Sequence, residues 1–494
     1  MRVDPKTPVL IGYGQINRRD EIDPQTRSVE PVDLMVAAAQ QAADAPVLRA
    51  VDSVRVVNVL SATYRDAGLL VGERIGAPKF TTLYSPVGGN VPQTLLNQAC
   101  LDIQQGRAGV VLLTGAETWR TRRGLKAKGS RLEWTAQDES VPMAQVSGED
   151  VPMAGDAELR IRLDRPAYVY PLFEQSLRIA NGESVEEHRN RIGELWARFN
   201  AVAVGNPHAW IRKPATAAEI VQPGPHNRMI SWPYPKLMNS NNMVDQGAAL
   251  ILTSVEQATR LRIPEERWIY PHAGTDAYDT PSIAERHELH RSAAIRIAGA
   301  RALQLAGLGI DDVDYVDLYS CFPSAVQVAA AELGLSIDDP ARPLTVTGGL
   351  TFAGGPWSNY VMHSIATVAE LLVANPGRRA LVTANGGYLT KHSFGVYGTE
   401  PPDEFRWENA QSVVDREPTR EALVQWEGAG TVEAWTTPFD RDGQPEKAFV
   451  AVRTPDGSRT LAVIADPDSA RATVREDIGG AKVTVSADGN ATLQ

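Results

Sequence analysis

The sequence has few cysteines and no long apolar run, and these shortages exclude several classes of protein. Only Cys100 and Cys321 occur in 494 residues. Two distant cysteines cannot form a disulfide framework or a thiolate metal site, so a reducing compartment, the cytoplasm, is expected. No window of about 18 consecutive apolar residues occurs, and the first residues lack a basic and apolar leader, so the sequence predicts neither a membrane span nor a secretory signal.

Several catalytic and cofactor motifs are also missing. The chain has no Gly-x-Ser-x-Gly elbow and no Gly-Lys-Ser/Thr, and Gly12-x-Gly14 lacks the third glycine of a dinucleotide fingerprint. His287 and His290 are spaced like metal ligands, but no third ligand accompanies them. The sequence therefore predicts no metal site and no covalently bound cofactor.

Short apolar segments alternate with helical periodicity through most of the chain, which is typical of an α/β domain with a buried sheet. The segment 91–104 has an amphipathic pattern, with Asn90 as its predicted N-cap. From about 119 to 235 the alternation is lost, which indicates a long insertion. Expected strands cover 9–12, 54–60, 80–84, 110–114, 315–318 and 380–384, and expected helices cover 32–43, 68–75, 91–104, 185–204, 283–305, 325–333 and 360–374.

One pattern occurs twice. Gly88-Gly89 precedes a helix, and a Gly-Arg pair and an apolar strand follow that helix. Gly354-Gly355 begins the same order in the second half of the chain. The repeat predicts two similar halves, with a site where glycine turns meet helix N-termini, because backbone donors there favour a thiolate or an oxyanion.

After about residue 418 the pattern changes to short alternating runs separated by Asp-Gly turns. Four or five strands and one helix predict a small OB-like barrel. From 420 to 494 there are eight Lys and Arg against twelve Asp and Glu. A nucleic-acid groove on such a barrel is expected to be basic, so this balance argues against nucleic acid as a partner.

Two further features are candidates for a catalytic or a binding role. Cys321 follows Tyr319 and precedes a helix that starts with Pro323, at the expected mouth of the sheet. A lone cysteine is more often a core residue than a catalyst. The second feature is a basic run without any acid, which is either a solvated loop or a site for a phosphorylated small molecule. The run comprises Arg120, Arg122, Arg123, Lys126, Lys128 and Arg131.

On these motifs the chain resembles the thiolase superfamily, in particular its SCP2-thiolase-like branch, over about residues 5–400. The helix at 91–104 and the strand after it resemble the buried helix that follows the family's nucleophile. Three short motifs match in the family's order. Tyr319-Ser320-Cys321-Phe322 stands where SCP2-type thiolases have His-Asp-Cys-Phe, Gly354-Gly355-Pro356 matches Gly-His-Pro, and Asn385-Gly386-Gly387 matches the last motif, Cys-x-Gly in many members.

The resemblance implies a fold and a division into domains. The fold is α/β, with two similar βαβαβ halves in a layered α/β/α/β/α arrangement, an inserted loop domain, and an additional C-terminal OB-like β-barrel. The N-terminal half would comprise 1–118 and 236–265, and the C-terminal half 266–417. The loop domain, which binds coenzyme A in thiolases, would cover 119–235, and the additional domain 418–494.

The resemblance also implies a site that has lost its usual chemistry. Thiolases need a cysteine nucleophile, a histidine that activates it, and a second cysteine as base. The nucleophile position falls on Gly89 and the Gly-His-Pro histidine on Gly355, while Tyr319 replaces another histidine. Cys321, at the base position, and Asn385 and Gly387, in the last motif, complete the candidate catalytic positions.

Three hypotheses remain open. The first is a degenerate thiolase-like protein of the acetyl-CoA acetyltransferase family that binds coenzyme A or an acyl-CoA, without ordinary thiolase activity. The second is a retro-aldolase that cleaves a β-hydroxyacyl-CoA with Tyr319 as general acid and base, its OB-fold partner fused in cis. The third is a nucleic-acid-binding or protein-binding module on the barrel. Candidate contacts for the coenzyme A phosphates are Arg120, Arg122, Arg123 and Lys126.

The expected partner is a small CoA thioester. The resemblance implies a homodimer, although an additional C-terminal domain that covers the dimer surface would leave a monomer.

Overall fold

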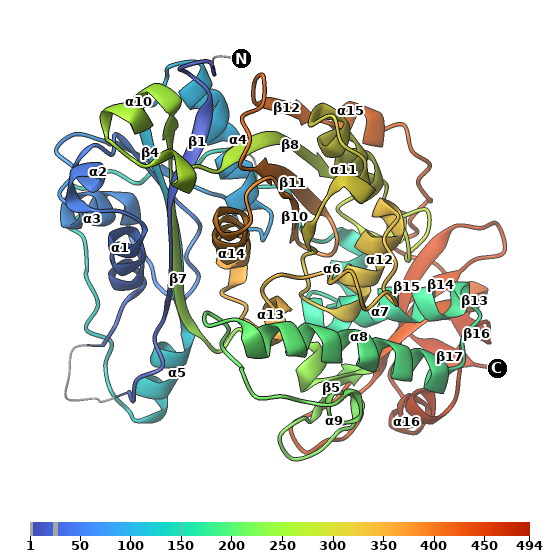
Figure 1. The fold of residues 1–494 in the computed structure, drawn as a ribbon. Coiled ribbons are helices and arrows are strands. Elements are labelled where there is room, and N and C mark those ends of the chain that lie inside the picture. The colour runs from blue at the N-terminus through green and yellow to red at the C-terminus, as the bar shows by residue number, and fades with distance from the viewer. Residues whose placement is uncertain (1–2, 23–27, 149) are drawn as a thin grey trace.

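Figure 1 shows the computed structural model, which describes residues 3–22, 28–148 and 150–494. The N-terminal half is built on a five-stranded mixed sheet. Its central strand, β4, has the sequence VVLLTGAET and is buried along its whole length, as expected for a strand covered on both faces. In spatial order the strands are β1 (Pro8–Asn17), β7 (Asp245–Ser254), β4 (Val110–Thr118), β2 (Ser53–Val56) and β3 (Thr81–Tyr84).

The C-terminal half repeats this plan with a second five-stranded sheet. Its strands β10 and β11 form an antiparallel hairpin in which Gly386 pairs with Lys391. β9 lies parallel to β10. In spatial order the strands are β12 (Arg406–Asn409), β8 (Tyr270–Tyr278), β11 (Lys391–Gly398), β10 (Arg379–Gly386) and β9 (Tyr315–Asp317).

Helices cover both sheets and fill the space between them. α4 (Val91–Gln104) and α14 (Tyr360–Ala374) contact strands of both sheets and form the central layer. α1 (Pro31–Ala42) and α3 (Ala67–Arg74) cover the outer face of the first sheet. α11 (Ala293–Leu305) covers the second sheet and packs on α12 (Pro323–Leu333). The predicted α/β/α/β/α layering is thus confirmed (Figure 1).

The regular secondary structure of the insertion between β4 and β7 is mainly helical. Its longest helix, α8 (Val185–Gly205), begins at a capping box, in which Ser184 Oγ accepts a hydrogen bond from Glu187 N, and extends one residue beyond the predicted end. The other helices of the insertion are shorter. They are α5 (Trp119–Ala127), α6 (Asp156–Ile161), α7 (Pro166–Ala180) and α9 (Ala217–Val221), followed by β5 (Met229–Trp232) and β6 (Tyr234–Pro235).

The C-terminal region is a strongly curved antiparallel sheet with one helix, α16 (Pro467–Arg475). Its two edges approach each other, because Val463 N donates to Gly489 O at 2.9 Å. The predicted antiparallel C-terminal domain is thus confirmed. Its assignment as an OB fold and the domain boundaries stay predictions. In spatial order the strands are β15 (Arg459–Ile464), β14 (Ala448–Arg453), β13 (Gly428–Pro438), β16 (Lys482–Val485) and β17 (Ala491–Leu493).

One local prediction was wrong. The helix expected over 283–305 begins only at Ala293, because Ser292 Oγ accepts a hydrogen bond from Ile295 N at 3.1 Å and starts the helix there. Asn90 is at the N-cap position of α4 as predicted, but its backbone angles are helical, φ −75° and ψ −25°, and its side chain makes no capping hydrogen bond. Among the described residues, none of the helices is both long and apolar enough to cross a membrane.

Candidate active site

The glycine turns singled out in the sequence meet at the N-terminus of α4. Gly88 N donates to Ser358 Oγ at 3.2 Å, and Ser358 follows the second glycine turn. Gly386 lies against the first turn, since a Cβ added to it would stand 3.1 Å from Gly89 N. Tyr319 N donates to Thr383 Oγ1 at 2.9 Å, so the end of β9 is held against β10. Segments far apart in sequence therefore build one buried site.

The position expected for the nucleophile has no room for a side chain. A Cβ built on Gly89 would overlap both the hydroxyl oxygen of Tyr319 and the carbonyl oxygen of Asn385, and would lie 2.7 Å from Tyr319 Cζ. One of these obstacles is a flexible side chain, but the other is backbone. Tyr319 thus fills the space beside the predicted nucleophile position.

The second vacant position is also closed. Gly355 N donates to Asn241 O at 3.0 Å, which holds the turn against the chain segment before β7. A Cβ on Gly355 would overlap Ser240 Oγ and lie 2.9 Å from Asn242 Oδ1. Polar side chains of that segment therefore occupy the volume that a histidine would need.

Tyr319 and Cys321 are both buried, each with 8% of its surface exposed. Burial raises the pKa of the Cys321 thiol to about 12, although hydrogen bonds from Tyr170 and Asn385 oppose the shift. Burial also raises the pKa of the Tyr319 hydroxyl well above its usual value, and the nearby Cys321 adds to the effect. Both groups are protonated at neutral pH, so Cys321 is a poor base in this state.

A tyrosine of the insertion, missed in the sequence, organises the last motif. Tyr170 Oη donates to Gly387 O at 3.0 Å and accepts from Asn385 Nδ2 at 2.9 Å and from Leu389 N at 3.2 Å. Asn385 Nδ2 also lies 3.9 Å from the Cys321 sulfur. Sequence spacing gave no signal for Tyr170, because the contact joins the insertion to the C-terminal half.

Because both cysteines are buried, their reactivity can be predicted and tested without a substrate. Burial raises the pKa of the Cys100 thiol as well, so neither sulfur is a thiolate near neutral pH. We expect a thiol reagent at pH 8 to label neither cysteine in the folded protein and two per chain in denaturant. Rapid labelling of one thiol in the native state would mean that the site around Cys321 is open.

The space beside the candidate catalytic residues is minimal. The cavity bordered by Tyr319, Asn385 and His392 measures about 10 Å³, which is room for about one water molecule. A substrate cannot enter this cavity unless side chains or loops move.

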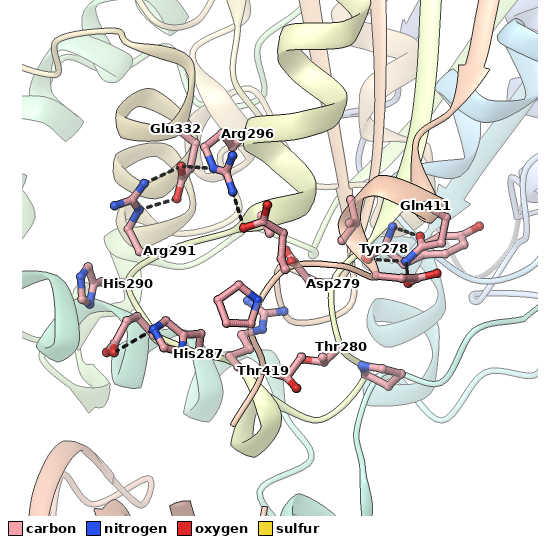
Figure 2. A pocket seen from close by; sticks show the side chains of 18 of the residues that line it. Tyr278, Asp279, Thr280, His287, His290, Arg291, Arg296, Glu332, Gln411 and Thr419 are labelled. Atoms are coloured by element: carbon pink, nitrogen blue, oxygen red, sulfur yellow. Dashed lines mark hydrogen bonds and ion pairs between the residues drawn. The ribbon is translucent and has the colours of Figure 1, made fainter. Parts of the chain in front are cut away.

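A larger cavity lies elsewhere and has a charged wall. It measures about 710 Å³ and lies between the first turn of α11, the loop after β8 and residues 411–419 (Figure 2). Its charges are largely paired: Arg291 Nε lies 2.6 Å from Glu332 Oε1, and Arg296 Nη2 lies 2.6 Å from Glu417 Oε2. None of the residues predicted for the site lines this cavity. His287 and His290 do line it, but the described residues contain no cluster of three metal-ligand side chains.

The basic run begins in α5, continues beyond its end, and lies largely on the surface. Arg120 is bound internally, with its guanidinium 3.4 Å from Asp245 and donating to the carbonyl of Asp20 at 2.9 Å. The exposed cations of the run are Arg122, Arg123, Lys126, Lys128 and Arg131. Within α5, Lys126 follows Arg122 by four residues and Arg123 by three, so these three cations lie on one side of the helix. Trp119 lies on the same face, with Arg122 5.1 Å over its ring and Trp357 6.2 Å away.

A buried lysine between two of the motifs was also missed. Lys391 is 3% exposed, and its Nζ donates to Val87 O at 3.0 Å and lies 3.4 Å from Asp150 Oδ1. Burial lowers the pKa of Lys391, although the Asp150 carboxylate opposes the shift. The sequence signal that could have indicated it is a lysine at the start of the run KHSFGVYG, all of which is buried.

Comparison with known proteins adds two family models and a set of relatives. Residues 409–490 match "Thiolase-like protein type 1 additional C-terminal domain", and residues 275–356 match "Thiolase C-terminal domain-like". A monomeric SCP2-thiolase like protein type 1 from Mycobacterium smegmatis is 33% identical, with full coverage of both chains and a TM-score of 0.84.

Two other relatives are more distant. An acetyl-CoA acetyltransferase from Methanothermobacter thermautotrophicus is 25% identical over 211 residues, 40% of this chain, and the match spans only 53% of that protein. The structure titled "Ltp2-ChsH2(DUF35) aldolase" is 19% identical, with 80% of this chain and 99% of that one covered and a TM-score of 0.59. At that identity the aldolase supports the fold alone.

Proposed function

Because the chain belongs to the SCP2-thiolase-like protein type 1 family, within the thiolase superfamily, we propose that it binds coenzyme A or a CoA thioester and does not catalyse thiolase turnover. One observation carries this proposal. The Tyr319 hydroxyl and the Asn385 carbonyl fill the space in which a nucleophilic cysteine at position 89 would begin. A thiolase cannot form its acyl-enzyme without that cysteine.

The chemistry of the remaining groups supports the same conclusion. The acyl-transfer step needs a thiolate and a base near neutral pH, whereas burial raises the pKa of the Cys321 thiol to about 12. Removal of a nucleophile and its base typically costs several orders of magnitude in rate.

The exposed face of α5 supports the binding half of the proposal. Arg122 lies over the ring of Trp119, which is 6.2 Å from Trp357, and Arg123 and Lys126 add two exposed cations on the same helix. Cations suit the phosphates of coenzyme A, and aromatic rings suit its adenine. Because Arg120 is already bound to Asp245, we leave it out of the proposed contact set. The M. smegmatis relative is described as monomeric, which favours a monomer over the dimer that most thiolases form.

The retro-aldolase remains a second candidate, supported by the position of Tyr319 beside Cys321. The cavity of about 10 Å³ at the Tyr319 side chain and its raised pKa count against it. Cleavage of a β-hydroxyacyl-CoA that is lost in Tyr319→Phe would establish this activity in place of the proposed one.

The test combines turnover with binding. We expect no thiolysis of acetoacetyl-CoA above background, and binding of coenzyme A by calorimetry. Replacing Arg122, Arg123 and Lys126 together by alanine should weaken binding at least about tenfold, because each charge-assisted hydrogen bond contributes about 1.5–3 kcal/mol. Lys213→Ala, an exposed change outside α5, is the control. Thiolysis at ordinary rates, or affinity that the triple variant leaves unchanged, would contradict the proposal.

A further inference from the structure

We infer that Lys391 is an acyl acceptor, whose amine takes the acyl group of a bound CoA thioester and becomes an amide. This inference rests on the proposed function, because it requires a CoA thioester in the site. It assigns an outcome to bound thioester that differs from thiolase turnover, since the amide does not release its acyl group.

The position of Lys391 is the first argument. It pairs with Gly386 across the β10–β11 hairpin, so it stands opposite the last family motif. Its side chain then reaches the first glycine turn, where Nζ lies 3.0 Å from Val87 O. A Cβ on Gly88 would lie 3.5 Å from Lys391 Cδ. The amine is therefore held beside the turn that carries the nucleophile in thiolases.

A cavity that reaches the same turn is the second argument. It measures about 350 Å³, within the range of small-molecule sites. Both residues that contact Lys391 Nζ, Val87 and Asp150, line it. Its wall is mainly apolar and aromatic, which suits an acyl chain better than the ion-paired wall of the larger cavity. Besides Val87, the apolar and aromatic lining residues are Tyr64, Ala67, Tyr84, Pro86, Met143, Ala144 and Val146.

The surroundings favour the neutral amine, the form that attacks a carbonyl. Only 4% of the Lys391 side chain is exposed, and burial disfavours its ammonium form. The nearby N-terminus of α4 carries the positive end of a helix dipole, which also disfavours a cation. Asp150 opposes both effects, but its side chain is 66% exposed and its charge is screened by water.

The reaction balances without a further reactant. The lone pair of Lys391 Nζ attacks the thioester carbonyl carbon and forms a C–N bond. The tetrahedral intermediate then collapses, the C–S bond breaks, and the electron pair leaves with the CoA sulfur. One Nζ proton passes through water to that sulfur. The products are one amide at Lys391 and one free CoA thiol per chain.

The experiment incubates the full chain with acetyl-CoA and follows both products. We expect thiol release to stop at one equivalent, and peptide mass spectrometry to find one acetyl group on Lys391 before the exposed Lys213 and Lys482 react. Lys391→Arg, which keeps a cation for Val87 and Asp150, should abolish the stoichiometric release. Asp150→Asn should accelerate it several-fold, since the carboxylate no longer stabilises the ammonium. The rate of thiol release should rise with pH. It should reach its plateau at a lower pH than the acetylation of an exposed lysine.

Binding is measured separately with an unreactive thioether analogue of acetyl-CoA. If the analogue binds but acetyl-CoA leaves Lys391 unmodified, the inference fails and the proposed function stands. If the analogue does not bind, the proposed function fails and the inference fails with it. Acetylation spread over exposed lysines, or unchanged in Asp150→Asn, would also overturn the inference. The wild-type chain and Asp150→Asn give these answers even if Lys391→Arg folds poorly.

Discussion

Replacing Gly89 by cysteine is expected to destabilise the protein and to leave thiolysis at background. The new Cβ would overlap the Tyr319 hydroxyl and the Asn385 carbonyl oxygen, so a side chain and the backbone of β10 must both move. Overpacking of this kind costs about 1–3 kcal/mol in a well-packed core. Thermal or urea unfolding measures the loss, and acetoacetyl-CoA with coenzyme A measures the activity.

The matched control is Gly224→Cys. Gly224 is exposed, and a Cβ there meets no atom within 4 Å, so the change should stay within about 0.5 kcal/mol. Combining Gly89→Cys with Tyr319→Ala removes the side-chain overlap but not the backbone one, and the loss of a buried ring adds its own cost, so the double variant should stay less stable than the wild type. Thiolysis should remain absent in the double variant, because Gly355 still supplies no histidine. A Gly89→Cys protein that is as stable as the wild type would contradict the conclusion that position 89 has no room for a side chain.

The fold was largely predictable because its signals are local. The apolar spacing over 91–104 gave the bounds of α4 correctly, and the apolar pattern over 360–374 did so for α14. The glycine pairs ahead of these helices predicted two similar halves. The helix expected over 283–305 failed for a local reason too, since Ser292 competes with the apolar periodicity and starts α11 ten residues later.

The candidate site was predictable only in part, because its decisive contacts join distant segments. Family motifs led to Gly89 and Tyr319 separately, but the sequence did not reveal that the hydroxyl of one fills the space beside the other. Tyr170 and Lys391 reach the site from the insertion and from β11. Their roles depend on register and packing, which spacing along the chain does not encode.

Arg459→Met is expected to cause the largest loss of stability, about 3–5 kcal/mol, because it removes one partner of a buried ion pair. Arg459 is fully buried. Its Nε and Nη2 bind the two Glu433 carboxylate oxygens at 2.6 and 2.7 Å. Its Nη1 donates to Ala284 O at 3.1 Å, so the side chain fastens the C-terminal sheet to the loop before α11. Methionine fills the volume but removes the hydrogen bonds that Arg459 donates to Glu433 and to the Ala284 carbonyl.

Arg453→Ala is the matched control, because Arg453 contacts the same Glu433 carboxylate at 3.1 Å from a side chain that is 28% exposed. Partial exposure limits its contribution to about 1 kcal/mol. Burial raises the pKa of Glu433, but hydrogen bonds and charge from Arg459 and Arg453 outweigh it and hold the pKa below its usual value. The pair therefore stabilises the fold above pH ~4.3, the unfolded pKa of glutamate, and loses this effect as the pH falls. The difference between wild type and Arg459→Met should shrink in acid, and equal losses for Arg459→Met and Arg453→Ala would show that Arg459 does not fasten the domain.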